Sequence, residues 1–104
     1  MDTAQQPVRV TVGETFDVPL EGIPTSGYIW ELDPHGLPDE VEFLAAEMRP
    51  ATGQIAGGSA VQTFTFRAVR VGEGRIRFRY RRRWEAEPSR EATIKVSVRA
   101  PDSR

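Results

Sequence analysis

Three short segments carry the residues whose types and spacing suit recognition of a partner. They are Pro24–Tyr28 (Pro-Thr-Ser-Gly-Tyr), Ala56–Ser59 (Ala-Gly-Gly-Ser) and Arg82–Trp84 (Arg-Arg-Trp), called here the first, second and third loop segments. The first combines a proline, which fixes φ, with a glycine, which permits a positive φ, so it predicts a stiff loop. The glycines of the second let the main chain approach a surface closely. The third ends in a tryptophan that can bury about 150–250 Å².

Residues for catalysis are nearly absent. The chain has no cysteine and one histidine, His35, in an Asp-Pro-His-Gly turn where a solvated side chain is expected. It shows no Gly-x-Ser-x-Gly motif, no phosphate-binding loop and no metal-ligand spacing. The sequence therefore predicts a protein that is not an enzyme and that needs no cofactor and no metal.

Length and composition indicate one domain. The 104 residues, 38% hydrophobic and 28% charged, suit a single globular unit over 1–104 with an ordered core at about 8–99. Residues 1–7 lack the basic and apolar regions of a signal peptide, which predicts either a cytoplasmic protein or the mature form of a secreted or periplasmic one. No membrane segment is expected, and we expect a monomer.

Period-two alternation recurs along the chain, and helical periodicity is nearly absent. The expected strands are Val8–Val12, Phe16–Leu20, Tyr28–Leu32, Val41–Leu44, Val61–Ala68, Arg75–Arg81 and Ala92–Val98. Pro19 places the second strand at an edge or at a point where the ladder is interrupted, and Val71–Gly74 predicts a tight turn. About seven short strands predict an all-β fold, a single immunoglobulin-like antiparallel β-sandwich. The aromatic residues expected between the sheets are Phe16, Trp30, Phe43, Phe64, Phe66, Phe78 and Tyr80.

The order of the strands groups the three loop segments. Connections alternate between the two ends of such a sandwich, and the segments fall in or beside the second, fourth and sixth connections, so they share one end. Trp84 keeps the alternation of Phe78 and Tyr80, which leaves both a core position and an exposed anchor open.

Charge is divided between the halves of the chain. Residues 1–50 hold ten acidic and two basic residues, a balance of −8, and residues 51–104 hold five acidic and twelve basic residues, a balance of +7. The five odd-numbered arginines from Arg75 to Arg83 are expected to face water. Complementary pairing between the sheets or attraction of an acidic partner would both account for the division.

The three segments in this order resemble the chagasin family of cysteine-protease inhibitors. In that family the first loop reads Asn-Pro-Thr-Thr-Gly followed by an aromatic residue, the second Gly-x-Gly-Gly, and the third Arg-Pro-Trp or a relative. The resemblance covers roughly Val8 to Val98. This chain departs from the pattern at Ile23, Ile55 and Arg83, which replace Asn, Gly and Pro.

The resemblance implies reversible, tight-binding inhibition of papain-like cysteine proteases by occlusion of the active-site cleft. Thr25 would enter near the catalytic cysteine and histidine of the protease, while the second and third loops grip either side. Trp84 would stack on an aromatic wall, and Arg82 would reach polar groups nearby. The implied protease-binding residues are Pro24, Thr25, Ser26, Gly27, Tyr28, Gly57, Gly58, Arg82 and Trp84.

Two other functions remain open from the sequence. An immunoglobulin-like interaction or adhesion module would keep the scaffold without inhibition. A nucleic-acid-binding domain would use the stripe from Arg75 to Arg83, beside Tyr80 and Trp84, to follow phosphates. The isoelectric point of about 5.8 argues against the latter.

Overall fold

Alternating apolar residues give almost every strand one face that is buried in a shared interior. The computed structural model describes residues 3–4, 6–22, 27–50 and 60–101, and over these residues it contains strands and no helix. The strands are β1 (Thr3–Ala4), β2 (Val8–Thr11), β3 (Thr15–Gly22), β4 (Tyr28–Leu32), β5 (Val41–Pro50), β6 (Ala60–Ala68), β7 (Gly72–Arg82) and β8 (Arg90–Arg99).

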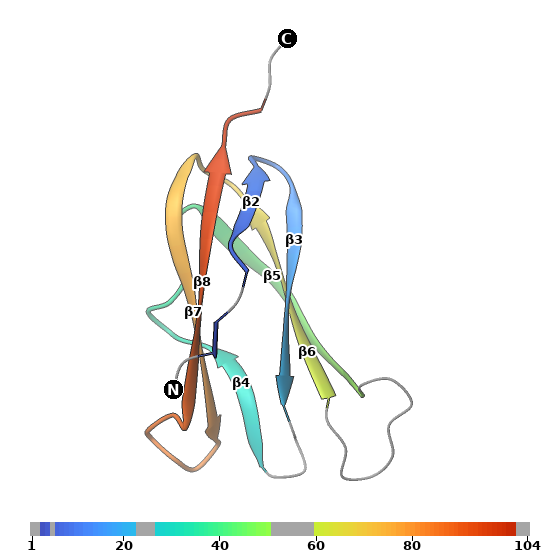
Figure 1. The fold of residues 1–104 in the computed structure, drawn as a ribbon, viewed down its shortest axis with the longest axis vertical. Coiled ribbons are helices and arrows are strands. Elements are labelled where there is room, and N and C mark those ends of the chain that lie inside the picture. The colour runs from blue at the N-terminus through green and yellow to red at the C-terminus, as the bar shows by residue number, and fades with distance from the viewer. Residues whose placement is uncertain (1–2, 5, 23–26, 51–59, 102–104) are drawn as a thin grey trace.

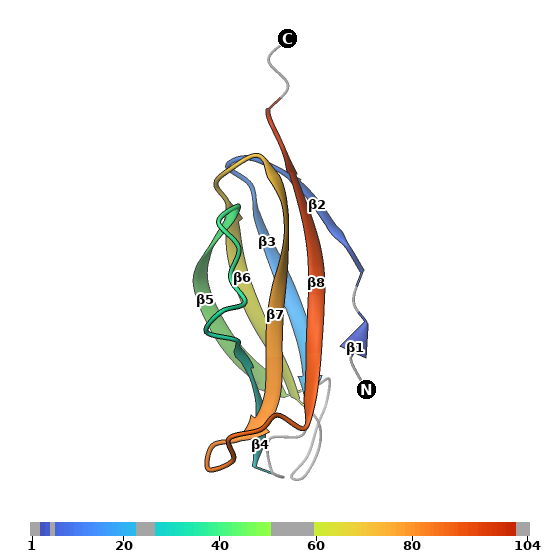
Figure 2. The same ribbon diagram turned by 90° about the vertical axis from the view of Figure 1, so that its left-hand side faces the viewer.

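The strands form two sheets that face each other (Figures 1 and 2). One sheet has the order β1-β8-β7-β4, with β2 also paired to β8, and the other has the order β3-β6-β5. The predicted sandwich is confirmed, and of the two positions left open for Pro19 the structure has the edge strand, β3. Two details differ from the sequence prediction. The short strand β1 was not expected, and β1 and β2 both run parallel to β8.

The predicted turn at Val71–Gly74 is wrong. The chain bends at residues 70 and 71, and β7 begins at Gly72, which pairs with Val98. The two glycines mark a close approach of neighbouring chain. A Cβ on Gly74 would lie 2.6 Å from the Cβ of Pro38, and one on Gly72 would lie 2.9 Å from a carboxylate oxygen of Glu40. The strand therefore needs glycine here because the connection between β4 and β5 packs over it.

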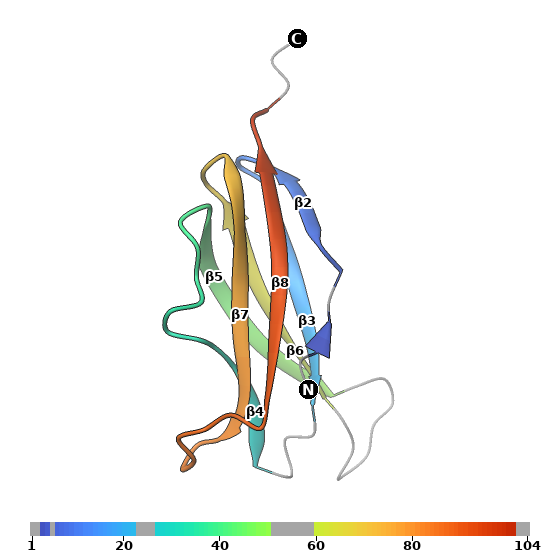
Figure 3. The ribbon, with the colours of Figure 1, turned by 60° about the vertical axis from the view of Figure 1, so that its left-hand side comes forward.

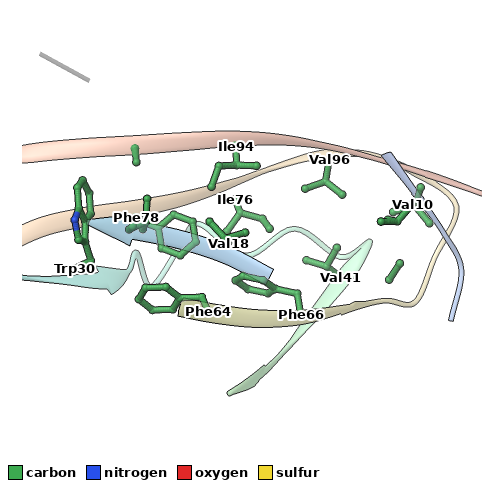
Figure 4. Packing of buried hydrophobic residues seen from close by; sticks show 14 of the residues in the cluster. Val10, Val18, Trp30, Val41, Phe64, Phe66, Ile76, Phe78, Ile94 and Val96 are labelled. Atoms are coloured by element: carbon green, nitrogen blue, oxygen red, sulfur yellow. The ribbon is translucent and has the colours of Figure 1, made fainter. Parts of the chain in front are cut away.

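The interior between the sheets is apolar. No polar or charged residue is buried in the described part of the chain, and the largest fully buried side chains are Trp30, Phe66, Phe78, Leu20, Ile76, Ile94 and Val96 (Figure 4). Phe43, expected in this interior, is 41% exposed because its strand β5 is an edge strand. It still contacts the rings of Phe64 and Phe66 from the rim. Strand β5 is also longer than expected, with a register shift between Phe43 and Ala45.

Three connections leave the sandwich at the same end, called here the loop end. They join β3 to β4, β5 to β6 and β7 to β8, and all six strand ends lie together (Figures 1 and 3). The strand register places these ends side by side, because Gly22 pairs with Ala60 and Tyr28 pairs with Arg82. The expectation that the three connections share one end is confirmed.

Candidate functional site

Four of the nine predicted site residues lie in the described part of the chain: Gly27, Tyr28, Arg82 and Trp84. All four are at the loop end. The other five, Pro24, Thr25, Ser26, Gly57 and Gly58, fall outside the described residues.

Arg82 is the centre of a stack of side chains. Its guanidinium carbon lies 4.5 Å from the ring centre of Tyr28 and 5.9 Å from that of Trp84, distances at which a cation is attracted to an aromatic face. Tyr28 in turn stacks on Tyr80, with ring centroids 5.3 Å apart. Because Tyr80 is buried, the stack links the loop end to the interior of the sandwich.

Trp84 is an exposed anchor, with 74% of its surface accessible. The chain turns directly after β7, where the N–H of Glu85 donates to the carbonyl of Arg82 at 3.0 Å. This turn takes Trp84 out of the alternation that buries Phe78 and Tyr80. Of the two positions that the sequence left open for Trp84, the structure has the exposed one.

Gly27 brings the first and third loop segments into contact. Its φ is +88°, a conformation that L side chains rarely adopt. A Cβ at this position would lie 3.3 Å from the Trp84 ring and 3.6 Å from the Cγ of Arg82. The positive φ therefore favours glycine, and the missing Cβ lets the Trp84 ring pack closely against the backbone.

A set of ion pairs holds the base of the third loop. The carboxylate of Glu31 accepts from Arg81 at 3.1 Å and from Arg79 at 3.2 Å, and the three side chains are no more than 28% exposed. Arg81 also donates to the backbone carbonyl of Glu85, which lies just beyond Trp84. Arg81 thus links the carboxylate of Glu31 to the turn that carries Trp84.

This set corrects one sequence prediction. Five arginines were expected to face water, but only Arg75, Arg77 and Arg83 are exposed, whereas Arg79 and Arg81 are half-buried. The reason is that Glu31 lies on the adjacent strand β4, opposite Arg79 and on the same outer face of the sheet. Glu31 was not among the predicted site residues, and its acidic side chain in an otherwise apolar strand was the available signal.

Trp30 was expected to be buried but not to organise the loop end. It is 2% exposed and lies at one end of the row of core side chains (Figure 4). Its indole N–H donates to the carbonyl of Glu21 at 3.0 Å, and both of its backbone polar groups bond to the side chain of Gln62. The guanidinium of Arg90 lies 5.6 Å from its ring.

Three further features concern the histidine, metal ligands and membrane-spanning helices. His35 is exposed in its turn, as expected. Among the described residues no three His, Cys, Asp or Glu side chains are grouped so that they could hold a metal ion. The described part of the chain contains no helix that is long and apolar enough to cross a membrane.

Comparison with known structures places the fold. The cysteine protease inhibitor EhICP2 from Entamoeba histolytica aligns with a TM-score of 0.73 at 21% identity, over 90% of this chain and 86% of that one. PbICP-C, whose structure was solved in complex with falcipain-2, aligns with a TM-score of 0.66 at 19% identity, over 94% of this chain and 91% of that one. These likenesses show that the sandwich is shared.

Comparison of sequences places the family. Amoebiasin-1 from Entamoeba histolytica is 32% identical over 99 residues, which is 93% of this chain and 94% of the relative. The model of the family described as Chagasin family peptidase inhibitor I42 matches residues 9–98, a span that includes all three loop segments. The chain therefore belongs to the chagasin family of peptidase inhibitors.

Proposed function

We propose that this domain is a reversible, tight-binding inhibitor of papain-like cysteine proteases and that it occludes the active-site cleft with its loop end. Membership of the family supports the class of activity. The observation that carries the site is the contact between Gly27 and the exposed Trp84, because it joins two of the three loop segments into one surface. Trp84 is also the most exposed of the large hydrophobic side chains in the described part of the chain.

The proposed roles follow the order of the loops. Thr25, flanked by Pro24, Ser26 and Gly27, enters the cleft near the catalytic cysteine and histidine of the protease. The backbone at Gly57 and Gly58 contacts one side of the cleft. Trp84 packs on the other side against an aromatic wall.

Arg82 has a role that the contacts of the loop end define further. Its guanidinium lies over Tyr28 and beside Trp84. We propose that Arg82 orients the tryptophan in addition to meeting polar groups of the protease. The stack would order Trp84 before binding, and a side chain that is already ordered loses little entropy when it docks.

The proposed mechanism is steric and non-covalent. It requires no nucleophile, no cofactor and no metal from this chain, and it acts by excluding substrate. A complex of this kind typically buries about 1,600 Å² in total. A tryptophan buried in such an interface is the kind of residue that carries much of the binding free energy.

Titration of papain and of a cathepsin-L-type protease with the purified domain tests the proposal. The expected result is saturable, competitive inhibition of peptide hydrolysis that is reversed by dilution. Absence of inhibition at micromolar concentrations by a domain with an intact β-sheet circular dichroism spectrum would contradict it. An adhesion module would give no inhibition, and a nucleic-acid-binding domain would instead show salt-sensitive binding to an oligonucleotide.

A further inference from the structure

Strand β4, which follows the first loop, has one edge that no described strand covers. It pairs with β7 on one side and forms the end of its sheet on the other. At Trp30 the backbone N–H donates to Oε1 of Gln62 at 2.7 Å, and the backbone carbonyl accepts from Nε2 of Gln62 at 2.9 Å. The two backbone groups of one residue are thus satisfied by a single side chain.

Gln62 makes this contact from the opposite sheet. It lies on β6, two residues after Ala60, the residue at which β6 begins next to the second loop. It shares the inward face of the strand with Phe64 and Phe66. Its amide therefore acts in place of a neighbouring strand, since it supplies one acceptor and one donor in the arrangement that a backbone would.

Trp30 contacts a residue near each of the three loops, so the position of β4 affects all three. Its indole N–H bonds the carbonyl of Glu21, which is close to the end of β3 and the start of the first loop. Its ring packs on Tyr80 with centroids 4.8 Å apart, near the start of the third loop. Through Gln62 it is joined to the strand that follows the second loop.

A stack of side chains links Trp30 to the exposed Trp84. Tyr80 packs on Tyr28, and Tyr28 lies beneath the guanidinium of Arg82, which adjoins Trp84. A shift of β4 relative to β6 would therefore displace the aromatic residues of the third loop as well as the first. Tyr80 also packs closely against the end of β3, because a Cβ on Gly22 would lie 3.0 Å from the Tyr80 ring.

We infer that Gln62 is a positioning residue for inhibition: its side-chain amide fixes β4 against β6 and so aligns the strand ends from which the three loops leave the sandwich. Gln62 belongs to none of the three loop segments and acts through Trp30. This inference rests on the function proposed above. The physical basis is pre-organisation. Loops that become ordered only on binding lose conformational entropy, and this cost lowers the affinity.

Two substitutions test the amide. Gln62→Met keeps the length of the side chain and removes both hydrogen bonds, and Gln62→Glu keeps the length and the acceptor but removes the donor when it is ionised. We expect each variant to raise the inhibition constant for papain about tenfold or more. The circular dichroism spectrum should stay that of the unaltered domain.

A matched control separates positioning from general stability. Ile76→Val removes one methylene group from a fully buried side chain on β7, and such a change costs about 0.5–1.5 kcal/mol of unfolding free energy. We expect it to leave the inhibition constant unchanged. If Gln62→Met inhibits as well as the unaltered domain, or if Ile76→Val weakens inhibition as much as Gln62→Met does, the inference is overturned.

Amide hydrogen exchange gives a readout that needs no protease. The amides of Gly27, Tyr28 and Trp30 should exchange faster in Gln62→Met and Gln62→Glu than in the unaltered domain, while those of Ile94 and Val96 should not. This arm holds even if the unaltered domain fails to inhibit, an outcome that would contradict the proposed function alone. Unchanged exchange at the loop end in both variants would contradict the role of Gln62.

Discussion

Trp84 shows at the level of one residue how a loop end can bind. Its side chain is 74% exposed, yet it is positioned by Arg82 and by contact with Gly27. Trp84→Ala should raise the inhibition constant for papain by about 30-fold or more, because truncation of an aromatic anchor buried in an interface costs roughly 2 kcal/mol or more. Titration against papain measures this directly.

The control for this substitution is another exposed apolar side chain. Val71 is 55% exposed and lies next to β7 at the end opposite the loop end. Val71→Ala should leave inhibition unchanged, and both variants should unfold near the midpoint of the unaltered domain. If Trp84→Ala inhibits as well as the unaltered domain, Trp84 is not part of the binding surface.

Gly27 allows a second test at the same scale. An alanine at a positive φ costs about 1–2 kcal/mol, and here its Cβ would also press against the Trp84 ring. Gly27→Ala should therefore lower stability and also weaken inhibition. Denaturant unfolding and protease titration of the same sample measure the two effects.

Gly13 provides the matched backbone control. Its φ is +97°, and a Cβ there would meet nothing within 4 Å. Gly13→Ala should lower stability by a similar amount with no effect on inhibition. If both alanine variants inhibit equally well, the contact between Gly27 and Trp84 contributes nothing to binding.

Strands β4 and β7 cooperate at the scale of elements. Glu31 on β4 holds Arg81 on β7, and Arg81 holds the carbonyl of Glu85 beyond Trp84. Lysine cannot replace this arginine, because it lacks the planar group that bonds two acceptors in different directions. We expect Arg81→Lys to increase the dissociation rate of the protease complex about fivefold, as measured by surface plasmon resonance.

Arg75 lies on the same strand and the same outer face, so it serves as the comparison. It is exposed, and it takes part in none of the ion pairs found among the described residues. Arg75→Lys should leave the dissociation rate as it is. Identical rates for Arg81→Lys and the unaltered domain would show that the ion pairs do not act on the Trp84 turn.

At the scale of the whole molecule, the interior stabilises the fold and the loop end binds. Ile94 is 1% exposed in the middle of β8, away from the loops. Ile94→Ala should lower the unfolding free energy by about 2–4 kcal/mol through the lost contacts and the cavity. The chain has no cysteine, so no disulfide offsets this loss.

Inhibition by Ile94→Ala should nevertheless match the unaltered domain at temperatures well below its unfolding midpoint. The reason is that a small domain folds as one cooperative unit, so the folded fraction keeps its loop end intact. Thermal unfolding and titration at 15 °C and 25 °C test this. A rise in the inhibition constant at 15 °C, with the variant folded, would show that the interior and the loops are not separable.

The division of charge along the chain also has its explanation at this scale. Ion pairs join acidic residues of the first half to arginines of the second, as in Glu42–Arg67, Asp39–Arg70 and the pairs of Glu31. The sequence left complementary pairing and an acidic partner as alternatives. The structure has such pairing, but within each sheet and not between the two sheets as expected, because the two halves of the chain contribute adjacent strands to the same sheet.

The sequence by itself determined seven of the eight described strands, most of their inward faces and the meeting of three connections at one end. These follow from local alternation and from the up-and-down course of the chain, and both can be read without knowing which strands pair. The same alternation misplaced Phe43, because a regular pattern does not show that a strand lies at the rim of a sheet.

Only the tertiary structure decided the details of the loop end. The exposure of Trp84 depends on a turn, the pairing of Glu31 with Arg81 on the register of two strands, and the contact of Gln62 with Trp30 on the packing of two sheets. Gly72 and Gly74 were mistaken for a turn because the chain that packs over them is more than thirty residues away. Contacts between distant residues are set by register and packing, and no local pattern encodes them.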